Sequence, residues 1–301
     1  MYKILKAEKL ADKIYLMDVE APRIAKACQP GEFVIVRMDE RGERIPLTIC
    51  DYDREKGTVT IVFQIVGAST ERMAGLKTGD SFIDVVGPLG NPSEFVHDDL
   101  EEVKNRKYLF VAGGVGTAPV YPQVKWLKEH GVSVDVIMGS KTKDLLILED
   151  EMRTVAGNLY VTTDDGSYER KGMVTEVIKD LVVNQGKKYD VCVAIGPMIM
   201  MKFTCLMTKE LGIPTIVSLN PVMVDGTGMC GACRVSVGGE SGPGARICDY
   251  SWVEAVHAQC IENGISFNYH QTGAKLIKDG KLYDIPRKLQ HTQAHKAGLD
   301  T

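Results

Sequence analysis

The sequence predicts a β plus α/β fold, in which an antiparallel barrel is followed by a doubly wound parallel sheet and then a small third domain. Residues 1–97 contain short β-branched and aromatic runs bounded by Gly and Asp, at the spacing of a small antiparallel barrel. Residues 98–220 alternate nearly continuous apolar runs with segments of helical spacing, which predicts a parallel sheet covered on both faces. From residue 221 the chain becomes glycine-rich and bears a cysteine pair.

Charge and hydropathy exclude several classes of protein. The net charge is -4, so the chain offers no general basic surface for nucleic acid or an anionic membrane. Residues 1–22 carry scattered charges without an apolar signal-peptide core, and no apolar run approaches the ~20 residues of a spanning helix. We therefore expect a cytoplasmic protein, whose 8 cysteines serve a metal or redox role in part rather than a disulfide framework. We expect four of them to be buried as small hydrophobic residues: Cys28, Cys50, Cys192 and Cys205.

The barrel prediction depends on three apolar runs, and two further motifs stand out beside them. The runs are GEFVIVRMD, GTVTIVFQIV and DSFIDVVGPLG. In RIPLTI, Arg44 supplies a permanent cation and Thr48 a small hydroxyl. In VGAST, Ser69 and Thr70 follow Gly67 and open a short helix whose free amides and hydroxyls suit a pyrophosphate. The residues alone slightly favour a plainer alternative, a helix cap beside an edge-strand salt bridge.

The glycine-rich turn VAGGVGTAP follows an apolar run and precedes a segment with helical spacing that stops at His130 and Gly131. Gly113, Gly114 and Gly116 permit a tight turn and a close approach of the backbone to a nucleotide. A tight turn without a ligand is the alternative. The position of two more turns favours the nucleotide, because TTDDGS and AIGPM also end predicted parallel strands, where open sheets bind ligands.

The acidic pair in TTDDGS has two interpretations that the sequence leaves open. Asp164 and Asp165 can accept hydrogen bonds from ribose hydroxyls. They are equally typical of residues that cap the next segment through an Asx-turn.

The stretch DGTGMCGACRV places Asp225, Cys230 and Cys233 in the spacing D-x4-C-x2-C. Plant-type [2Fe–2S] ferredoxins use C-x4-C-x2-C and a distant fourth Cys, so Asp225 stands where the first thiolate would be. Zinc is the competing metal, although a structural zinc site normally shows two close ligand pairs; a redox dithiol is another alternative. For the fourth ligand we favour Cys248 over Cys260, which falls in a segment with helical spacing.

The order of these motifs, together with GPLGNPSE and VAGGVGTAPVYP, resembles the small (alpha) subunits of NADH-dependent ferredoxin:NADP oxidoreductase, also called sulfide dehydrogenase. This family is a close relative of the electron-transfer subunit of dihydroorotate dehydrogenase. The resemblance covers residues 1–241 and implies the ferredoxin reductase pattern. On that pattern residues 1–97 form an FAD-binding barrel, 98–220 an NAD(P)-binding domain, and 221–248 a [2Fe–2S] segment.

The resemblance also implies which residues bind the cofactors. Arg44 would contact the FAD phosphates, and Thr48 would lie near the hydride-accepting edge of the flavin. The whole implied FAD set is Arg44, Pro46, Leu47, Thr48, Gln64, Val66, Gly67, Ser69 and Thr70. The implied nicotinamide dinucleotide set is Gly113, Gly114, Val115, Gly116, Asp164, Asp165, Gly166, Ser167, Gly196, Pro197 and Met198. The implied cluster ligands are Asp225, Cys230, Cys233 and Cys248.

By resemblance, a hydride passes between NAD(P)H and FAD, and single electrons then pass to the cluster. A larger partner subunit with another FAD and [4Fe–4S] clusters would receive them, in electron bifurcation among ferredoxin, NADH and NADP. This chemistry needs no side-chain acid, base or nucleophile, so no catalytic residue is expected. One alternative is the electron-transfer subunit of a dihydroorotate dehydrogenase, against which Asp225 argues because four cysteines hold the cluster there.

Residues 249–301 form an atypical tail. The stretch from GESGPGARICDYSWV onward resembles a different, phage-type family of unknown function, and both families carry GGES near the apparent junction. We therefore expect that the chain is a fusion. A second alternative function follows from this, namely a product that binds flavin but lacks a complete cluster.

Overall fold

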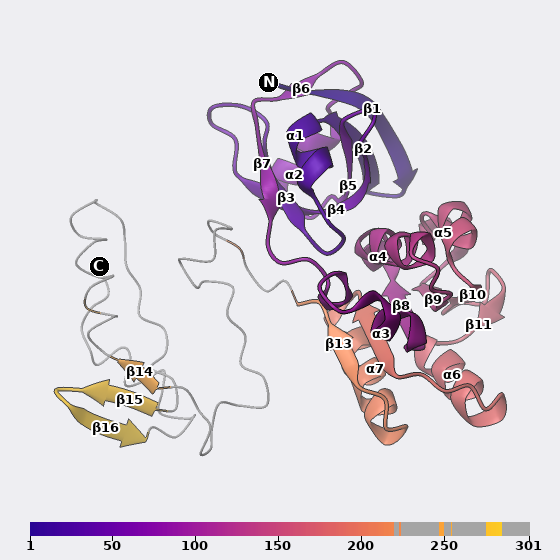
Figure 1. The fold of residues 1–301 in the computed structure, drawn as a ribbon. Helices are drawn as coiled ribbons and strands as arrows, with labels where there is room; N and C mark the ends of the chain where they lie inside the picture. Colours follow the sequence, from indigo (N-terminus) through magenta and orange to yellow (C-terminus); the bar gives the residue numbers. More distant parts are fainter. Residues whose placement is uncertain (220–222, 224–246, 250–253, 255–274, 285–301) are drawn as a thin grey trace. The chain divides into compact units, whose positions relative to one another are not determined.

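The computed structural model describes residues 1–219, 223, 247–249, 254 and 275–284 (Figure 1). The chain divides into two compact units, residues 1–233 and 234–301. Among the described helices, none has the length and apolar character needed to cross a membrane.

The first half of unit one is an antiparallel, nearly closed barrel sheet with the strand order β6-β1-β2-β5-β4-β3-β7. Its strands are β1 (Tyr2–Ala11), β2 (Ile14–Glu20), β3 (Phe33–Arg37), β4 (Ile45–Asp53), β5 (Thr58–Gln64), β6 (Ser81–Phe82) and β7 (Asp84–Leu89). The short helices α1 (Pro22–Ala27) and α2 (Ala68–Ala74) complete this half. Alternate residues of β5 pack on opposite faces of the sheet: Val59, Ile61 and Phe63 are buried in the barrel core, while Val62 packs in a separate cluster.

The second half is a parallel sheet with the order β11-β10-β9-β8-β12-β13. Its strands are β8 (Tyr108–Gly113), β9 (Asp135–Ser140), β10 (Asn158–Thr163), β11 (Arg170–Lys171), β12 (Val191–Ile195) and β13 (Thr215–Val217). Its α-helices are α3 (Leu100–Asn105), α4 (Thr117–Glu129), α5 (Glu149–Val155), α6 (Val174–Lys179) and α7 (Met198–Glu210). Its short helices are η1 (Glu94–Val96), η2 (Gly114–Gly116), η3 (Lys143–Leu145) and η4 (Asp180–Asn184). The chain begins in the middle with β8, builds outward to β10, and then returns to place β12 on the other side of β8.

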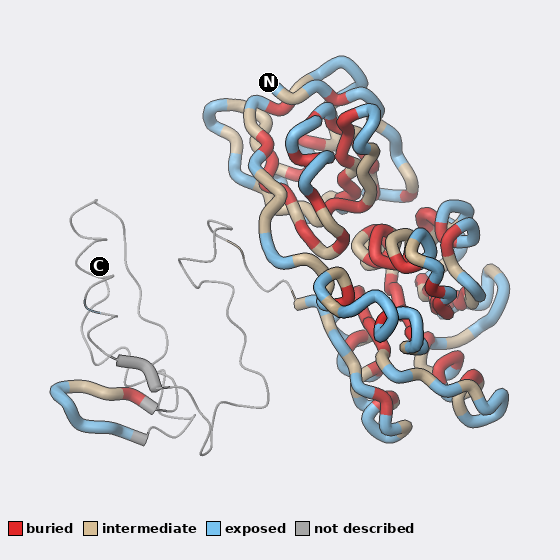
Figure 2. The backbone as a smooth tube through the Cα atoms, in the orientation of Figure 1, coloured by how far each residue is buried: buried red, intermediate tan, exposed pale blue. Residues whose placement is uncertain are grey.

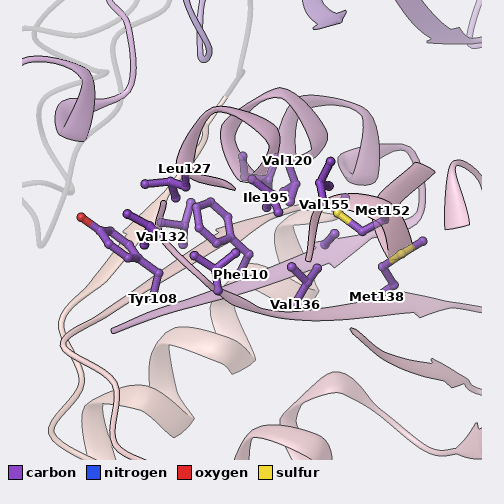
Figure 3. Packing of buried hydrophobic residues seen from close by; sticks show 14 of the residues in the cluster. Tyr108, Phe110, Val120, Leu127, Val132, Val136, Met138, Met152, Val155 and Ile195 are labelled. Atoms are coloured by element: carbon purple, nitrogen blue, oxygen red, sulfur yellow. The ribbon is translucent and has the colours of Figure 1, made fainter. Parts of the chain in front are cut away.

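Alternate residues of β8 pack on opposite faces of this sheet. Tyr108 and Phe110 join a buried cluster with residues of α4 and α5, part of which Figure 3 shows. Leu109 and Val111 join another cluster with residues of α6 and α7. The period of two explains why the strand reads as one continuous apolar run, since both of its faces are covered. The predicted barrel and doubly wound sheet are confirmed, and helix α4 ends beside His130 as expected.

A mixed interface joins the two halves of unit one. Buried side chains of the barrel strands pack against Ala118 of α4 and against Ile147 and Leu148, which precede α5. At the edge of this cluster, Lys125 Nζ lies 2.6 Å from Asp51 Oδ1. Buried and half-buried residues therefore run through both halves (Figure 2).

The described part of unit two is a three-stranded sheet of β14 (Ile247–Asp249), β15 (Lys275–Lys278) and β16 (Lys281–Asp284). Strands β14 and β15 are parallel, whereas β15 and β16 form a hairpin. Its two turn residues, Asp279 and Gly280, have φ values of 52° and 72°, the conformation that a two-residue hairpin favours.

Candidate functional site

The turns after β8 and β12 meet where the order of the parallel sheet reverses. A Cβ atom added to Gly116 would lie 2.2 Å from the carbonyl oxygen of Ile195 and 2.8 Å from Cα of Gly196. A Cβ on Gly196 would lie 3.0 Å from Cα of Gly113. The two turns are therefore in backbone contact, and only glycine fits there. Ligands of open α/β sheets bind at such a reversal, outside the carboxyl ends of the strands.

One side of the same turn is open. Gly114 has a φ of 53°, and a Cβ built there would meet no atom within 4 Å. Gly113, in contrast, faces α7, because its added Cβ would lie 2.4 Å from Met200 Sδ and 3.0 Å from Pro197 Cδ. Met198 begins α7 and is 62% exposed. Val115 is half-buried against the cluster between the two halves. The turn thus offers an open backbone surface beside an exposed apolar side chain.

The turn after β10 lies at the same edge of the sheet, beyond β9. Asp165 Oδ1 accepts a hydrogen bond from the Ser167 amide at 2.9 Å, and the Ser167 hydroxyl oxygen accepts one from the Lys143 amide at 2.8 Å. The hydrogen bonds from Ser167 lower the pKa of the Asp165 carboxyl. Gly166 has a φ of 77°. Asp165 therefore makes the capping contact that was one of its two interpretations.

Asp164 differs from its neighbour. Its amide donates to the Ser140 carbonyl at 3.0 Å, and its side chain is exposed. This places an exposed carboxylate at the carboxyl edge of β10.

Strand β4 holds the RIPLTI residues on the barrel. Pro46 and Leu47 pair with Ile35 and Val34 of β3, and Thr48 pairs with Phe33. Thr48 also lines a cavity of about 450 Å³, whose other walls include Pro119, Ile195 and Ser218 from the α/β half. Thr48 therefore faces space shared by both halves of unit one.

The cavity is also lined by residues for which the sequence predicted no binding role. Asn91 and Ser93 line it, and both belong to the quoted motif GPLGNPSE. The signal that could have identified them is their position as polar residues just after the predicted strand DSFIDVVGPLG.

The VGAST turn leaves β5 next to an exposed surface. Gln64 and Gly67 are exposed, and Val66 is 81% exposed. The Thr70 hydroxyl oxygen accepts hydrogen bonds from the Val66 amide at 2.9 Å and the Gly67 amide at 3.1 Å. Thr70 therefore shapes the turn, whereas Ser69 is the hydroxyl nearer the surface.

Acidic side chains contact the cationic and hydroxyl groups of this surface. Arg44 is exposed, and its Nη1 lies 3.5 Å from Asp84 Oδ2. The Ser69 hydroxyl donates a hydrogen bond to the Glu43 carboxylate. Neither acid was predicted from the sequence, in which the position of Glu43 directly before Arg44 is the only local signal.

The expected cluster ligands fall mostly outside the described residues. Asp225, Cys230 and Cys233 lie there. Cys248 lies in β14, where its backbone pairs with Leu276. Within the described ranges no three His, Cys, Asp or Glu side chains gather as a metal site.

Of the four cysteines that were expected to be buried, three are buried and Cys205 is not. Cys260 lies outside the described residues. Cys28, Cys50 and Cys192 are buried, and Cys205 is half-buried. Burial raises the pKa of the Cys28 and Cys192 thiols to about 12, so both remain protonated and unreactive at neutral pH.

Two family models match the chain. The oxidoreductase NAD-binding domain matches residues 110–206, which span β8 to α7. A protein family of unknown function, DUF5131, matches residues 205–299. The expected change of family toward the C-terminus is confirmed.

Curated relatives match most of the chain. An uncharacterized protein in the adh 3' region of Clostridium beijerinckii is 66% identical over 240 residues, 80% of this chain and 81% of the relative. A dihydroorotate dehydrogenase B electron transfer subunit homolog of Thermotoga maritima is 45% identical over 258 residues, 84% of this chain and 88% of the relative. The corresponding electron transfer subunit of Fusobacterium nucleatum is 35% identical and covers 75% of this chain and 85% of its own length.

Solved structures agree with these relatives. A chain of the NADH-dependent reduced ferredoxin-NADP oxidoreductase matches with a TM-score of 0.71 and 45% identity, covering 79% of this chain and 82% of its own. Phthalate dioxygenase reductase, at 16% identity and a TM-score of 0.54, shares the fold. The chain therefore belongs to the ferredoxin-reductase-type oxidoreductases, in the family of dihydroorotate dehydrogenase B electron-transfer subunits and their homologues.

Proposed function

We propose that this chain is an electron-transfer flavoprotein subunit that passes electrons between NADH and FAD and onward to a [2Fe–2S] cluster. The observation that carries the proposal is the backbone contact between the turns of Gly116 and Gly196, which builds a nucleotide cradle at the reversal point of the sheet. The 45% identity to a chain of the NADH-dependent ferredoxin-NADP oxidoreductase supports NADH as the ligand of this cradle.

The barrel fits FAD. Arg44 supplies an exposed cation for the phosphates, and Gly67 adds an exposed backbone position with no atom within 4 Å of an added Cβ. Thr48 lines the shared cavity, and its hydroxyl would donate to a flavin ring that faced the α/β half. The implied set of Arg44, Pro46, Leu47, Thr48, Gln64, Val66, Gly67, Ser69 and Thr70 therefore forms the proposed flavin surface, with Thr70 supporting its shape.

The α/β half fits NADH. Gly113, Gly114 and Gly116 would admit the diphosphate, and Asp164 would accept hydrogen bonds from a ribose. Met198 and Pro197, exposed at the start of α7, would contact the nicotinamide end. These residues bind and orient, and none has to transfer a proton as an acid or base.

The donor set Asp225, Cys230, Cys233 and Cys248 is suited to a [2Fe–2S] cluster with one oxygen ligand. Bound flavin would accept an electron pair from nicotinamide and release electrons singly, which a one-electron centre requires. We also propose a larger partner subunit bearing flavin and [4Fe–4S] clusters, through which ferredoxin would react. The support is that two of the relatives are named as electron transfer subunits or their homologues, and that a solved structure of a ferredoxin-NADP oxidoreductase is 45% identical.

The first test is the cofactor content of the anaerobically purified full chain. We expect about one FAD and about two irons with matching acid-labile sulfide per chain. Dithionite should produce the EPR signal of a reduced [2Fe–2S] cluster, altered in Asp225→Ala and lost in Cys248→Ala. Zinc in place of iron, or a signal that survives Cys248→Ala, would contradict the proposed ligand set.

Flavin binding tests the barrel separately. Arg44→Ala should weaken FAD binding about tenfold, because a charge-assisted contact to phosphate is lost. Arg41→Ala removes an exposed cation of the same loop and is the matched control. Equal FAD affinity of the two variants, measured by quenching of flavin fluorescence, would argue against a phosphate contact at Arg44.

A second candidate is a fusion product that binds flavin without a cluster. The DUF5131 match over residues 205–299 favours it, because this range includes every proposed cluster ligand. Flavin without iron in the content assay would select this candidate, and a sequencing read across the GGES codons would show whether the junction is genomic.

A further inference from the structure

The loop between β3 and β4, residues 38–44, is attached to helix α2 at two points. At one end, Arg72 Nη2 lies 2.5 Å from Asp39 Oδ2. At the other end, the Ser69 hydroxyl donates to the Glu43 carboxylate. The loop is itself held in shape by Arg37, which donates from Nε to the Asp39 carbonyl at 2.9 Å. Glu43 is therefore placed by the loop over the first turn of α2.

The contact between Glu43 and Ser69 occupies the donor that a phosphate would need. A serine hydroxyl has a single proton to donate. A carboxylate and a phosphate are both anionic acceptors, and both form strong, charge-assisted hydrogen bonds with the same donor. While the Ser69 hydroxyl donates its hydrogen bond to Glu43, it cannot donate one to a phosphate oxygen.

The charge of the loop strengthens this competition. Residues 37–44 contain three acidic side chains (Asp39, Glu40, Glu43) and three basic ones (Arg37, Arg41, Arg44), so they carry no net charge. Arg44, the cation for the phosphates, is also close to an acid, because its Nη1 lies 3.5 Å from Asp84 Oδ2. The surface therefore offers a diphosphate less positive potential than its arginines suggest.

We propose that Glu43 acts as an internal competitor of the diphosphate for Ser69 and so sets the affinity of the barrel for flavin dinucleotide. The inference rests on the proposed function, because it takes the Arg44 and Ser69 surface as the phosphate site. A ligand with a diphosphate displaces Glu43 from Ser69. A flavin without a phosphate does not compete with Glu43 for the Ser69 hydroxyl.

The test compares FAD affinity of the full chain, freed of flavin, with that of Glu43→Gln. Glutamine can still accept from Ser69 but carries no charge, so FAD should bind about five- to tenfold more tightly at low salt. The gain should shrink in high salt, since part of it is electrostatic. Glu40→Gln is the matched control: the exposed Glu40 lies in the same loop and loses the same charge, and we expect less than about a twofold change.

Two further measurements separate this mechanism from a general charge effect. ADP, a diphosphate without the flavin ring, should show the same gain in Glu43→Gln, whereas riboflavin, which has no phosphate, should show none. In a Ser69→Ala background, the gain from Glu43→Gln should fall to the level of the Glu40→Gln control.

Each contrary result has a distinct meaning. Equal FAD affinity for Glu43→Gln and Glu40→Gln would overturn the competition. Weaker FAD binding by Glu43→Gln would also overturn it, because Glu43 would then be a ligand of the flavin. Absence of FAD binding by the unaltered chain and by every variant would overturn the proposed flavin site, and this inference with it.

Discussion

Gly116→Ala should weaken NADH binding at least about tenfold and lower the stability of unit one. The backbone of Gly116 has a φ of −59°, which alanine adopts without strain, so any effect comes from the added methyl group. That group would lie 2.2 Å from the Ile195 carbonyl oxygen, and the turns after β8 and β12 would have to move apart. We expect a loss of about 2–4 kcal/mol in the free energy of unfolding and at least about a tenfold rise in the Kd for NADH.

Gly114→Ala is the control for the predicted loss of stability, because Gly114 itself belongs to the proposed nucleotide site. Gly114 has the opposite properties, a φ of 53° and no atom within 4 Å of an added Cβ. The left-handed backbone should cost about 1–2 kcal/mol, with no displacement of the second turn. Urea unfolding of both variants would measure this difference in stability, and NADH titration of Gly116→Ala would measure its Kd. If Gly116→Ala were as stable as the wild-type chain, the close approach of the two turns would be wrong.

Asp135→Ala should destabilise the α/β half even though it lies away from the nucleotide edge. Asp135 begins β9 and is 9% exposed. Its Oδ2 accepts from Lys187 Nζ at 2.6 Å and from the Tyr189 hydroxyl at 2.5 Å, and its Oδ1 accepts from Asn158 Nδ2 at 2.7 Å. Removing the carboxylate leaves the partly buried ammonium of Lys187 with the Tyr160 hydroxyl as its remaining hydrogen-bond partner. We therefore expect a loss of about 2–4 kcal/mol in the free energy of unfolding.

The matched variant is Asp12→Ala, which removes an exposed carboxylate paired with Lys9 Nζ at 3.6 Å. An exposed pair is screened by water, so this variant should unfold close to the wild-type urea midpoint. Equal midpoints for the two variants would mean that the Asp135 network contributes nothing to stability.

The same network predicts a pH dependence. Burial opposes ionisation of Asp135 most strongly, yet the hydrogen bonds from Lys187, Tyr189 and Asn158 outweigh it and lower the pKa of the carboxyl. Its contribution to stability is therefore fully present above the unfolded-state pKa of about 3.9 and is lost as the pH falls through the lower, folded-state pKa. Asp135→Ala should flatten the acid limb of the stability curve, measured as the urea midpoint between neutral and acid pH. An acid limb as steep as that of the wild-type chain would show that other carboxyls account for it.

Much of the fold could be predicted from the sequence because it depends on local spacing. The continuous apolar run from Tyr108 to Ala112 predicts a strand covered on both faces, and the structure places it at the centre of the parallel sheet. The glycines after that run predict a tight turn, and the turn is observed. Both features depend on residues within a few positions of each other.

The candidate site was predictable only as a set of residue types. The sequence marked Ser69 and Thr70 alike as phosphate-facing hydroxyls, and it left Asp164 and Asp165 equivalent. The structure distinguishes the members of each pair, because Thr70 is turned toward the amides of its own loop and Asp165 caps its own turn.

The sequence by itself determined the succession of a barrel and a doubly wound sheet, the motifs and their family, and the change of family in the C-terminal part. Only the tertiary structure decided that Gly116 touches the Ile195 backbone, that Thr48 opens onto a cavity shared by both halves, and that Glu43 engages Ser69. The physical reason is separation along the chain. Periodicity reports which face of one element is buried, whereas a contact such as that between Glu43 and Ser69, 26 residues apart, exists only after the elements that carry them have packed.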